Sequence, residues 1–235
     1  METLSGKYAI VTGGTRGIGR AIAERLLQDG AAVAICGRRQ DAVDRAVGEM
    51  QGLGRIVGTA ADVSDVEGAR RLFAAVDEAF GALDILVNNA GLGLFKKVGE
   101  MTPEEWHRNI DLNLNGAFYC AHEALARFAK RGGGFIVNIS SLAARNPFSG
   151  GAAYNASKFG LNGFTEALML DHRNDNVRVS SIMPGSVDTD FSGNGETAAW
   201  KIAPEDVAEA VSMVLRMPAR TMVSRVEIRP SRPSK

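Results

Sequence analysis

Short apolar runs alternate with longer amphipathic stretches along most of the chain. The runs have the length of buried strands, and the stretches carry apolar residues at helical spacing. In the first stretch Ile18, Ala21, Ile22 and Leu26 form one apolar stripe. We predict strands at about 7–12, 32–37, 55–60, 83–88, 134–140, 177–183 and 222–228. We predict helices at about 17–29, 40–52, 66–80, 103–130, 152–172 and 204–216.

The alternation of strand and helix predicts one α/β domain over residues 1–235. Strands such as 32–36 are apolar without interruption, which is typical of a parallel sheet covered by helices on both faces. We therefore expect a single-domain Rossmann fold, a doubly wound parallel sheet of about seven strands. Ligands of such sheets lie beyond the carboxyl ends of the strands, where Asn88–Gly91, Ser141 and Pro184 fall.

The predicted helical region 103–130 contains a weak point. Asn113 and Gly116 lie in its middle, and both are poor helix formers. We therefore expect a local irregularity of the helix at these two residues.

Composition and charge exclude several functional classes. The chain carries 27 basic and 27 acidic side chains and no basic cluster, which argues against a nucleic-acid partner. The sequence shows neither the apolar segment of a signal peptide nor a membrane-spanning run, so we expect a cytoplasmic protein without a membrane partner. Cys36 and Cys120 belong to no CxxC pair or His/Cys cluster, so we expect buried, reduced thiols and no metal site.

A glycine-rich turn, Gly13–Gly19, follows the first predicted strand and leads directly into the first predicted helix. Strand, glycine turn and helix in this order form a dinucleotide-binding unit, in which helix-terminal amides face a pyrophosphate. Glycine is needed where the backbone turns tightly or approaches a phosphate closely. Taken alone, the motif could also be an ordinary glycine-rich loop that caps a helix.

Tyr154 and Lys158 lie four residues apart in a predicted helix, and Ser141 precedes the tyrosine. Residues at i and i+4 share one helix face, so the ammonium can reach beneath the phenol. Acid–base use of a phenol at neutral pH requires its anion to be stabilised by roughly 4 kcal/mol. A fixed lysine cation in a site that excludes water can supply a contribution of that size, which indicates chemistry on an oxygen. An isolated pair at this spacing also occurs on exposed helices.

Six segments occur in an order that resembles the short-chain dehydrogenase/reductase family. They are TGGTRGIG, DILVNNAG, the DLNLNG segment around Asn113, Ser141, the pair Tyr154 and Lys158, and MPGSVDT. The resemblance covers residues from about 7 to 189. The C-terminal VSRVEIRPSRPSK departs from the Gly-Gly tail of many members and looks more like the branch containing 3-hydroxy acid dehydrogenases.

The resemblance implies a catalytic role for four residues. Tyr154 would be the general acid that protonates a carbonyl oxygen as hydride arrives from a nicotinamide, and Ser141 would hold the same oxygen. Lys158 would lower the pKa of the tyrosine and bind the nicotinamide ribose. Asn113 would anchor a water between Lys158 and solvent, near a backbone carbonyl freed by the helix irregularity. Alternatively, Asn113 only kinks its helix and Ser141 is a simple strand-end hydroxyl.

The resemblance also implies a set of cofactor contacts. Asn88–Gly91 would leave space for the adenosine side, and the pair Asp62 and Val63 would contact the adenine unless Asp62 only caps the following helix. Pro184, Gly185 and the segment 187–189 would close over the nicotinamide. The expected cofactor-binding residues are Gly13, Thr15, Arg16, Gly17, Ile18, Gly19, Arg38, Arg39, Asp62, Val63, Asn89, Ala90, Gly91, Tyr154, Lys158, Pro184, Gly185, Val187 and Thr189.

The end of the second predicted strand indicates the coenzyme. An NAD enzyme would usually place Asp or Glu there to bind the adenosine ribose, but this chain has no acid before Asp41. Arg16 lies in the glycine turn, where NADP-dependent members of the family commonly carry a basic residue. Arg16 and Arg38 therefore predict NADP(H), with both side chains reaching a 2′-phosphate and Arg39 secondary.

The substrate is indicated only by class. The stretch from about 190 to 203 resembles the family's substrate lid, and its aromatic residues are Phe191 and Trp200. Arg145 could pair with a substrate carboxylate or be a solvated loop residue. A modest apolar pocket is expected from Leu92, Leu94, Phe95, Leu142 and Phe148. We expect reduction of a small or medium ketone, aldehyde or 3-oxo acid, with a 3-oxoacyl thioester on a carrier protein as the alternative.

The sequence leaves two other functional classes open: an NADP-binding regulator without turnover and a methyltransferase. The complete set of four catalytic residues argues against the regulator, and Arg38 lies where methyltransferase folds prefer an acid.

The helices at about 112–130 and 152–172 carry apolar residues around much of their circumference, which predicts a homodimer or homotetramer. These residues are Phe118, Tyr119, Phe128, Phe159, Leu161, Phe164 and Met169.

Overall fold

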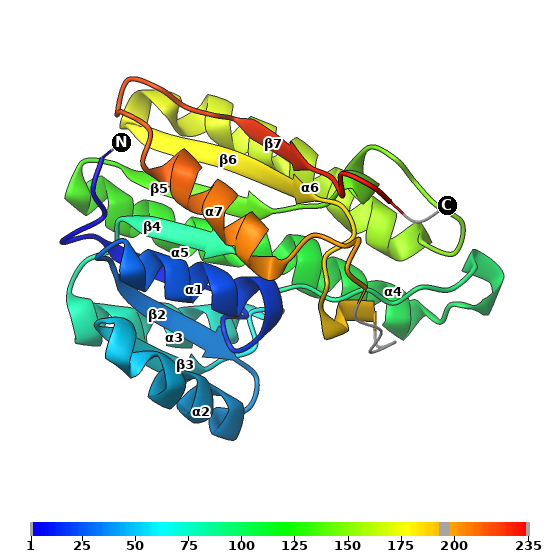
Figure 1. The fold of residues 1–235 in the computed structure, drawn as a ribbon, viewed down its shortest axis with the longest axis horizontal. Helices are drawn as coiled ribbons and strands as arrows, with labels where there is room; N and C mark the ends of the chain where they lie inside the picture. The colour runs from blue at the N-terminus through cyan, green and yellow to red at the C-terminus, as the bar shows by residue number, and fades with distance from the viewer. Residues whose placement is uncertain (1, 193–197, 234–235) are drawn as a thin grey trace.

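The computed structural model describes residues 2–192 and 198–233, and its strands form one seven-stranded sheet in the order β3-β2-β1-β4-β5-β6-β7 (Figure 1). The strands are β1 (Tyr8–Val11), β2 (Ala32–Gly37), β3 (Ile56–Ala60), β4 (Ile85–Asn88), β5 (Gly134–Ile139), β6 (Val177–Pro184) and β7 (Arg225–Ile228). The helices are α1 (Gly17–Gln28), α2 (Gln40–Met50), α3 (Val66–Phe80), α4 (Pro103–Ile110), α5 (Gly116–Arg131), α6 (Ala152–His172) and α7 (Pro204–Leu215). The predicted α/β Rossmann fold is confirmed.

The sheet is parallel throughout, and its winding reverses at β1. Strands β2 and β3 add on one side of β1, whereas β4 to β7 add on the other, with Val11 opposite both Ile35 and Val87. The strand arrows in Figure 1 point the same way, so the loops that follow β1, β4, β5 and β6 meet at one edge. Ligands of doubly wound sheets bind at such a reversal point.

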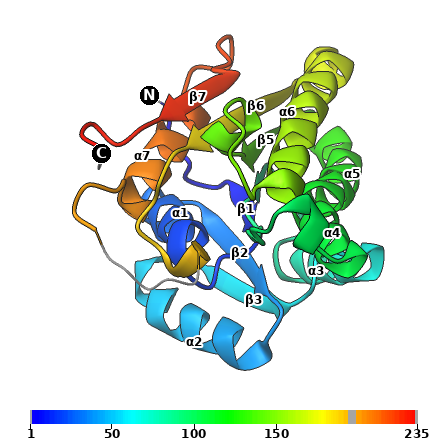
Figure 2. The ribbon, with the colours of Figure 1, turned by 90° about the vertical axis from the view of Figure 1, so that its right-hand side faces the viewer.

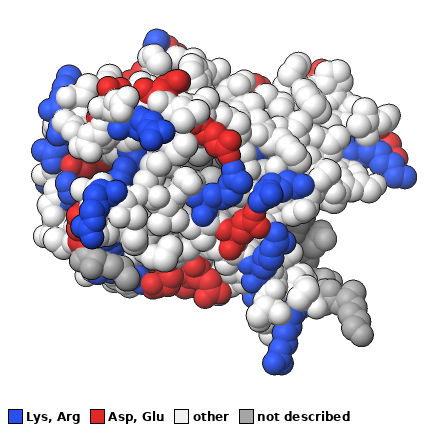
Figure 3. All heavy atoms as spheres, turned by 90° about the horizontal axis from the view of Figure 1, so that it is seen from above, with Lys and Arg blue, Asp and Glu red and all other residues white. Residues whose placement is uncertain are grey.

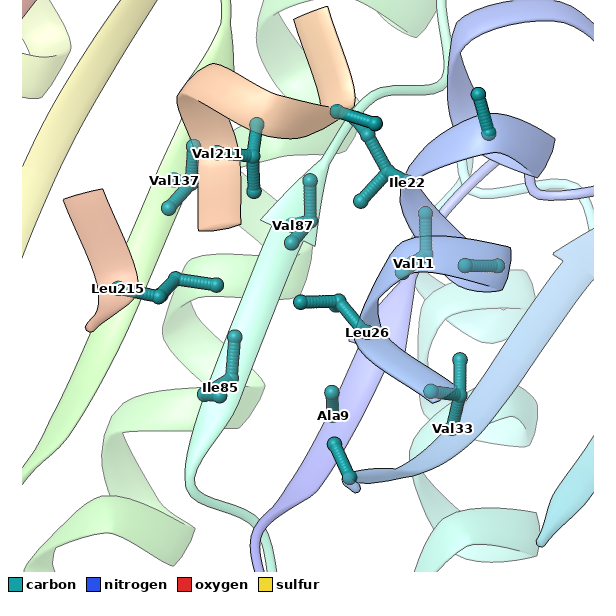
Figure 4. Packing of buried hydrophobic residues seen from close by; sticks show 14 of the residues in the cluster. Ala9, Val11, Ile22, Leu26, Val33, Ile85, Val87, Val137, Val211 and Leu215 are labelled. Carbon is teal, nitrogen blue, oxygen red and sulfur yellow. The ribbon is translucent and has the colours of Figure 1, made fainter. Parts of the chain in front are cut away.

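Helices cover both faces of the sheet, with α1, α2 and α7 on one side and α3, α5 and α6 on the other (Figure 2). Alternate strand residues serve the two layers, because successive side chains point to opposite faces. Figure 4 shows Ile22 of α1 and Val211 of α7 around Val87 of β4, and all three are fully buried. Burying each such side chain stabilises the fold by roughly 1.5–3 kcal/mol. This packing holds in place the loops that follow β1, β4, β5 and β6.

The expected helix irregularity is confirmed. Between α4 and α5, residues Asp111–Asn115 form a π-helical turn, with the buried Asn113 at its centre. The backbone at Gly116 then approaches the loop after β3 so closely that a Cβ would lie 2.7 Å from the carbonyl oxygen of Val63. Only glycine fits there, and π-helical turns are frequent at functional sites.

The surface carries mixed charge. On the face seen in Figure 3, basic and acidic side chains lie interspersed. Within the described ranges, no helix is long and apolar enough to cross a membrane. The cytoplasmic location expected from the sequence stays a prediction.

Candidate active site

A cavity of about 920 Å³ opens at the carboxyl ends of the central strands. All the residues predicted to bind the cofactor line it, together with Ser141. The structure therefore brings together segments that are far apart in the sequence. Residues on its wall that the sequence analysis did not assign to the cofactor include Cys36, Gly37, Ala42, Ala61, Leu112, Ile139, Ser140, Asp188 and Asp190.

The glycine turn forms the floor of this cavity. Gly13 and Gly17 have φ angles of 66° and 55°, which favour glycine. At Gly19 a Cβ would collide with the side chain of Asn89 and the carbonyl group of Gly13. Helix α1 starts at Gly17 and has no acidic residue in its first turn, so its unpaired amides present a positive helix end to the cavity.

Thr12 and Asn89 brace the turn from behind. The Thr12 hydroxyl accepts hydrogen bonds from the backbone amides of Asn89 and Ala90, each at 3.0 Å. The Asn89 side chain donates to the carbonyl oxygen of Thr12 at 2.9 Å. The segment Asn89–Ala90 thus holds the glycine turn in shape, a role that was not expected from the sequence. The sequence signal for this role is Thr12, a polar residue directly before Gly13 at the end of an apolar strand.

Three arginines lie at the β2 end of the cavity. Arg39 forms an ion pair with Asp41 at 3.2 Å. Arg16 and Arg38 are exposed, line the cavity and form no ion pair with any residue that the structure describes. Two unpaired guanidinium groups at one end of a cavity suit a bound phosphate.

Asp62 lines the same end of the cavity and is not the cap of the next helix. Its carboxylate accepts hydrogen bonds from the backbone and side chain of Ser64, at 3.0 and 2.7 Å. Asp65 is the N-cap of α3 and accepts from the amide of Gly68 at 2.8 Å. The alternative of a purely capping role for Asp62 is therefore wrong.

Ser141, Tyr154 and Lys158 meet at the other end of the cavity. Ser141 follows β5, and its hydroxyl accepts a hydrogen bond from the amide of Ala143 at 3.1 Å. Tyr154 and Lys158 lie near the start of α6 on one face, and both are buried. The Lys158 ammonium donates to the carbonyl oxygen of Ile139 at 2.9 Å and lies 5.8 Å from the centre of the Tyr154 ring.

The pKa of Tyr154 runs against the prediction from sequence. Burial raises the pKa of the phenol, and its hydrogen bond with Ser141 acts in the opposite direction. The sequence predicted a lowered pKa, whereas burial dominates in the structure and the net shift is upward. The ammonium is directed at the Ile139 carbonyl oxygen, and burial lowers its own pKa to about 8, which weakens it as a cation.

The buried lysine should make stability depend on pH. The pKa of Lys158 falls from an ordinary 10.5 to about 8 on folding, so between these pH values the unfolded chain holds a proton that the folded chain has released. Lys158 should therefore contribute a rise in the free energy of unfolding across this window, by up to about 3 kcal/mol, whereas the buried thiols of Cys36 and Cys120, whose pKa values are raised by burial, contribute a fall above about pH 9. Lys158→Met should remove the contribution of Lys158 and make the slope with pH less positive, because methionine does not titrate.

Urea unfolding at several pH values measures this effect. The exposed Lys97 offers a matched control, and Lys97→Met should keep the pH dependence of the unmodified protein. The slope with pH is the sharper readout, because Lys158→Met also removes the hydrogen bond to Ile139. An unchanged slope in Lys158→Met would show that Lys158 titrates normally in the folded protein.

Asn113 lies behind Lys158 and outside the large cavity. Its side chain bonds Leu92 at both backbone groups, accepting from the amide at 2.8 Å and donating to the carbonyl oxygen at 2.9 Å, and donates to the Ser157 hydroxyl at 3.0 Å. A second cavity of about 10 Å³ lies among Asn113, Lys158 and Asn88. Its volume corresponds to about one water molecule. The Asn88 Oδ1 atom is buried and has no hydrogen-bond partner among the described residues.

The outer side of Tyr154 faces aromatic residues. Of the five residues expected to form an apolar pocket, Leu92 lines the large cavity, and Phe95 and Phe148 pack against the Tyr154 ring. Leu94 and Leu142 do not line it. Arg145 forms an ion pair with Glu227 at 2.7 Å. The Arg145 guanidinium group therefore already has a carboxylate partner within the chain.

The predicted lid begins with a short 3-10 helix, η6 (Asp190–Ser192), and residues 193–197 of it lie outside the described residues. The two ends of this segment are joined by backbone hydrogen bonds, from Asp188 to Ile202 at 2.8 Å and from Ile202 to Ser186 at 3.0 Å. In the part of the chain that the structure describes, no group of His, Cys, Asp and Glu could hold a metal ion.

Comparison with known proteins gives consistent matches. Residues 7–199 match the family model described as short chain dehydrogenase. The dehydrogenase/reductase SDR family member 4 of Oryctolagus cuniculus is 40% identical over 94% of this chain and 83% of its own length. A 3alpha-hydroxysteroid dehydrogenase of Mediterraneibacter gnavus is 40% identical over 88% of each chain. The structure of an alcohol dehydrogenase from the archaeon Thermococcus sibiricus complexed with 5-hydroxy-NADP has a TM-score of 0.90 and 31% identity, covering 97% of this chain and 99% of its own.

Proposed function

The chain belongs to the short chain dehydrogenase family, and on that premise we propose that it is an NADP(H)-dependent oxidoreductase that reduces a small or medium carbonyl compound to an alcohol. One observation carries the proposal. A single cavity joins an unpaired arginine pair at one end to Ser141, Tyr154 and Lys158 at the other. Family membership excludes the methyltransferase interpretation.

The residues present fit a dinucleotide. The cavity volume lies within the range of cofactor sites, and the glycine turn lets a pyrophosphate approach the start of α1. Arg16 and Arg38 would hold a 2′-phosphate, and Lys158 and the segment 187–189 would hold the nicotinamide side. Ser140 supports the fit, since its buried hydroxyl lines the cavity without a hydrogen-bond partner among the described residues.

The nicotinamide supplies the hydride when it is bound. Ser141 would donate a hydrogen bond to the substrate oxygen and stabilise the charge that develops there. Tyr154 would then donate its proton to the same oxygen. Burial raises the pKa of Tyr154, which keeps the phenol protonated at neutral pH, in the form that can donate. Lys158 carries its proton below a pKa of about 8 and would stabilise the phenolate left behind.

We propose that Asn113 positions a proton path behind Lys158. The π-helical turn places Asn113 beside Lys158, and the small cavity between them has room for about one water. Such a water would pass protons toward Lys158 and from there to the phenolate. The three hydrogen bonds of Asn113 fix the wall of this cavity.

The proposed function is tested by mixing the purified protein with NADPH and a panel of ketones, aldehydes and 3-oxo acids. We expect loss of NADPH absorbance together with formation of the matching alcohol. A protein that binds NADPH tightly but consumes it with no carbonyl compound, including a 3-oxoacyl carrier-protein thioester, would instead be a non-catalytic NADP-binding regulator.

We also propose that the protein is a two-fold homo-oligomer. Of the apolar residues expected to mediate assembly, Phe128 and Leu161 are buried within the subunit, whereas Phe118 of α5 and Phe159 of α6 are exposed. Phe118 also contacts Phe164 across the two helices, at 6.1 Å between ring centres. This aromatic patch lies on the outside of the α5 and α6 layer, where a second subunit would cover it.

Light scattering at micromolar concentration should therefore give the mass of a dimer or tetramer. Phe118→Asp should shift the protein toward the monomer, because a carboxylate would be buried at the interface. Leu53→Asp, at an exposed site outside this patch, should leave the mass unchanged. A monomeric mass for the unmodified protein contradicts the proposal.

A further inference from the structure

Three phenylalanines surround the outer side of Tyr154. Phe95 comes from the loop after β4, Phe148 from the loop before α6 and Phe191 from η6 of the lid. Their ring centres lie 5.4, 6.4 and 5.9 Å from that of Tyr154. Phe95 and Phe148 also meet each other at 5.5 Å, in an edge-to-face arrangement. We call these three residues the aromatic cage.

Two glycines provide the space for this arrangement. A Cβ at Gly93 would lie 2.5 Å from the ring of Phe95 and 2.7 Å from that of Phe191. A Cβ at Gly151 would lie 2.7 Å from the ring of Phe148. The rings therefore pack directly on the backbone of these two glycines, where any other residue would displace them.

The cage keeps a large apolar surface open. Although the rings contact one another, Phe95, Phe148 and Phe191 are 41%, 44% and 42% exposed. Apolar surface gathered beside a reactive hydroxyl marks a ligand site more often than an ordinary part of the exterior. Aromatic faces and edges bind a flat or alicyclic ring better than a short alkyl group, since the contact area is larger.

Three basic side chains near the cage are already paired within the described structure. Arg145 pairs with Glu227 at 2.7 Å, and Lys96 next to Phe95 pairs with Glu105 at 2.5 Å. The single lysine of the lid, Lys201, lies 3.8 Å from Asp188. Asp190 adds an exposed carboxylate at this end of the cavity. An anionic substrate group would meet the Asp190 carboxylate here, while Arg145, Lys96 and Lys201 already have carboxylate partners of their own.

Resting on the proposed function, we propose that the aromatic cage sets substrate choice and selects neutral ketones whose carbonyl group carries an aryl or alicyclic ring. Anionic 3-oxo acids are disfavoured by the same geometry. The ring would lie against the exposed surfaces of Phe95, Phe148 and Phe191, with its carbonyl oxygen at the Tyr154 hydroxyl. This narrows the substrate range that the sequence indicated.

A matched pair of ketones tests the charge selection. para-Methylacetophenone and para-acetylbenzoate have nearly the same shape and differ in one negative charge. With NADPH in excess, we expect kcat/KM to be at least about tenfold higher for the neutral ketone. Equal values, or a preference for the carboxylate, would overturn the proposal.

The role of the cage is tested by the ratio of kcat/KM for acetophenone to that for acetone. Phe95→Ala and Phe148→Ala should each lower this ratio by roughly tenfold, whereas Phe95→Leu, which keeps an apolar side chain, should lower it less. Leu53→Ala, at an equally exposed site outside the cavity, is the control and should leave the ratio unchanged. Circular dichroism and NADPH titration confirm that each variant is folded and binds the cofactor.

The two levels of the proposal fail in different ways. If the unmodified protein reduces acetone as well as acetophenone, or the alanine variants keep the original ratio, the cage does not select substrates although carbonyl reduction stands. If the protein binds NADPH and reduces no carbonyl compound of the panel, the proposed function and the cage proposal both fail.

Discussion

Tyr154→Phe is expected to lower kcat/KM for carbonyl reduction by roughly 10³-fold while leaving the fold intact. The substitution removes only the hydroxyl. The phenylalanine ring can keep the edge contacts that Tyr154 makes with Phe95 and Phe191, at 5.4 and 5.9 Å between ring centres. Ser141 would still hold the substrate oxygen, but no group would be placed to give it a proton.

The loss should appear in turnover and leave cofactor binding in place. NADPH titration by protein fluorescence should give a similar Kd for Tyr154→Phe and the unmodified protein, and steady-state kinetics should show the fall in kcat. Retention of more than about a tenth of the activity would show that Tyr154 is not the proton donor.

Arg38→Asp is expected to erase or invert the preference for NADPH over NADH, which we expect to be roughly 10²-fold in the unmodified protein. Arg38 lies exposed on the cavity wall and, like Arg16, has no ion-pair partner among the described residues. Both guanidinium groups are thus available to a 2′-phosphate. An aspartate at this position would repel the phosphate and accept hydrogen bonds from a bare ribose.

Arg45→Asp is the matched control. Arg45 is an exposed residue of α2 that does not line the cavity, and its substitution changes the net charge by the same amount. The ratio of kcat/KM for NADPH to that for NADH should stay high in Arg45→Asp and fall to one or below in Arg38→Asp. Equal kcat/KM values for the two coenzymes in the unmodified protein would refute the assignment.

Much of the fold could be predicted because the apolar pattern is strong. An uninterrupted apolar run such as Val33–Ile35 predicts a strand that is buried on both faces. The structure has this strand at Ala32–Gly37, the bounds that the sequence predicts. Strand boundaries were less accurate. The last strand starts at Arg225, three residues after the predicted start at 222. Its residues are exposed or half-buried, so the apolar pattern does not show where its pairing with β6 begins.

The cofactor side of the site was legible for a related reason. The sequence itself shows where the backbone must turn tightly, through glycine at 13, 17 and 19. It also shows where positive charge lies, through arginine at 16 and 38. The structure places all five residues on one cavity. The bracing hydrogen bonds of Thr12 and Asn89 were not foreseen, because they join residues 77 positions apart.

The electrostatics of the catalytic end could not be inferred from spacing. Residues at i and i+4 share a helix face, but spacing does not say that Lys158 would direct its ammonium at the Ile139 carbonyl oxygen. It also does not give the depth of burial, which raises the pKa of Tyr154 and lowers that of Lys158. The sequence indicated an apolar pocket with Phe95 and Phe148 and a lid with Phe191, but it did not show that the three rings pack around Tyr154.

Isotope transfer tests the central claim most directly. The protein is given NADPH that carries deuterium at the transferable position of its nicotinamide, together with a ketone it turns over, and the alcohol is examined by mass spectrometry. We expect the alcohol to carry one deuterium on the former carbonyl carbon, and the same reaction with unlabelled NADPH in heavy water to place none on that carbon. An alcohol whose new carbon-bound hydrogen comes from the solvent would contradict hydride transfer in this cavity.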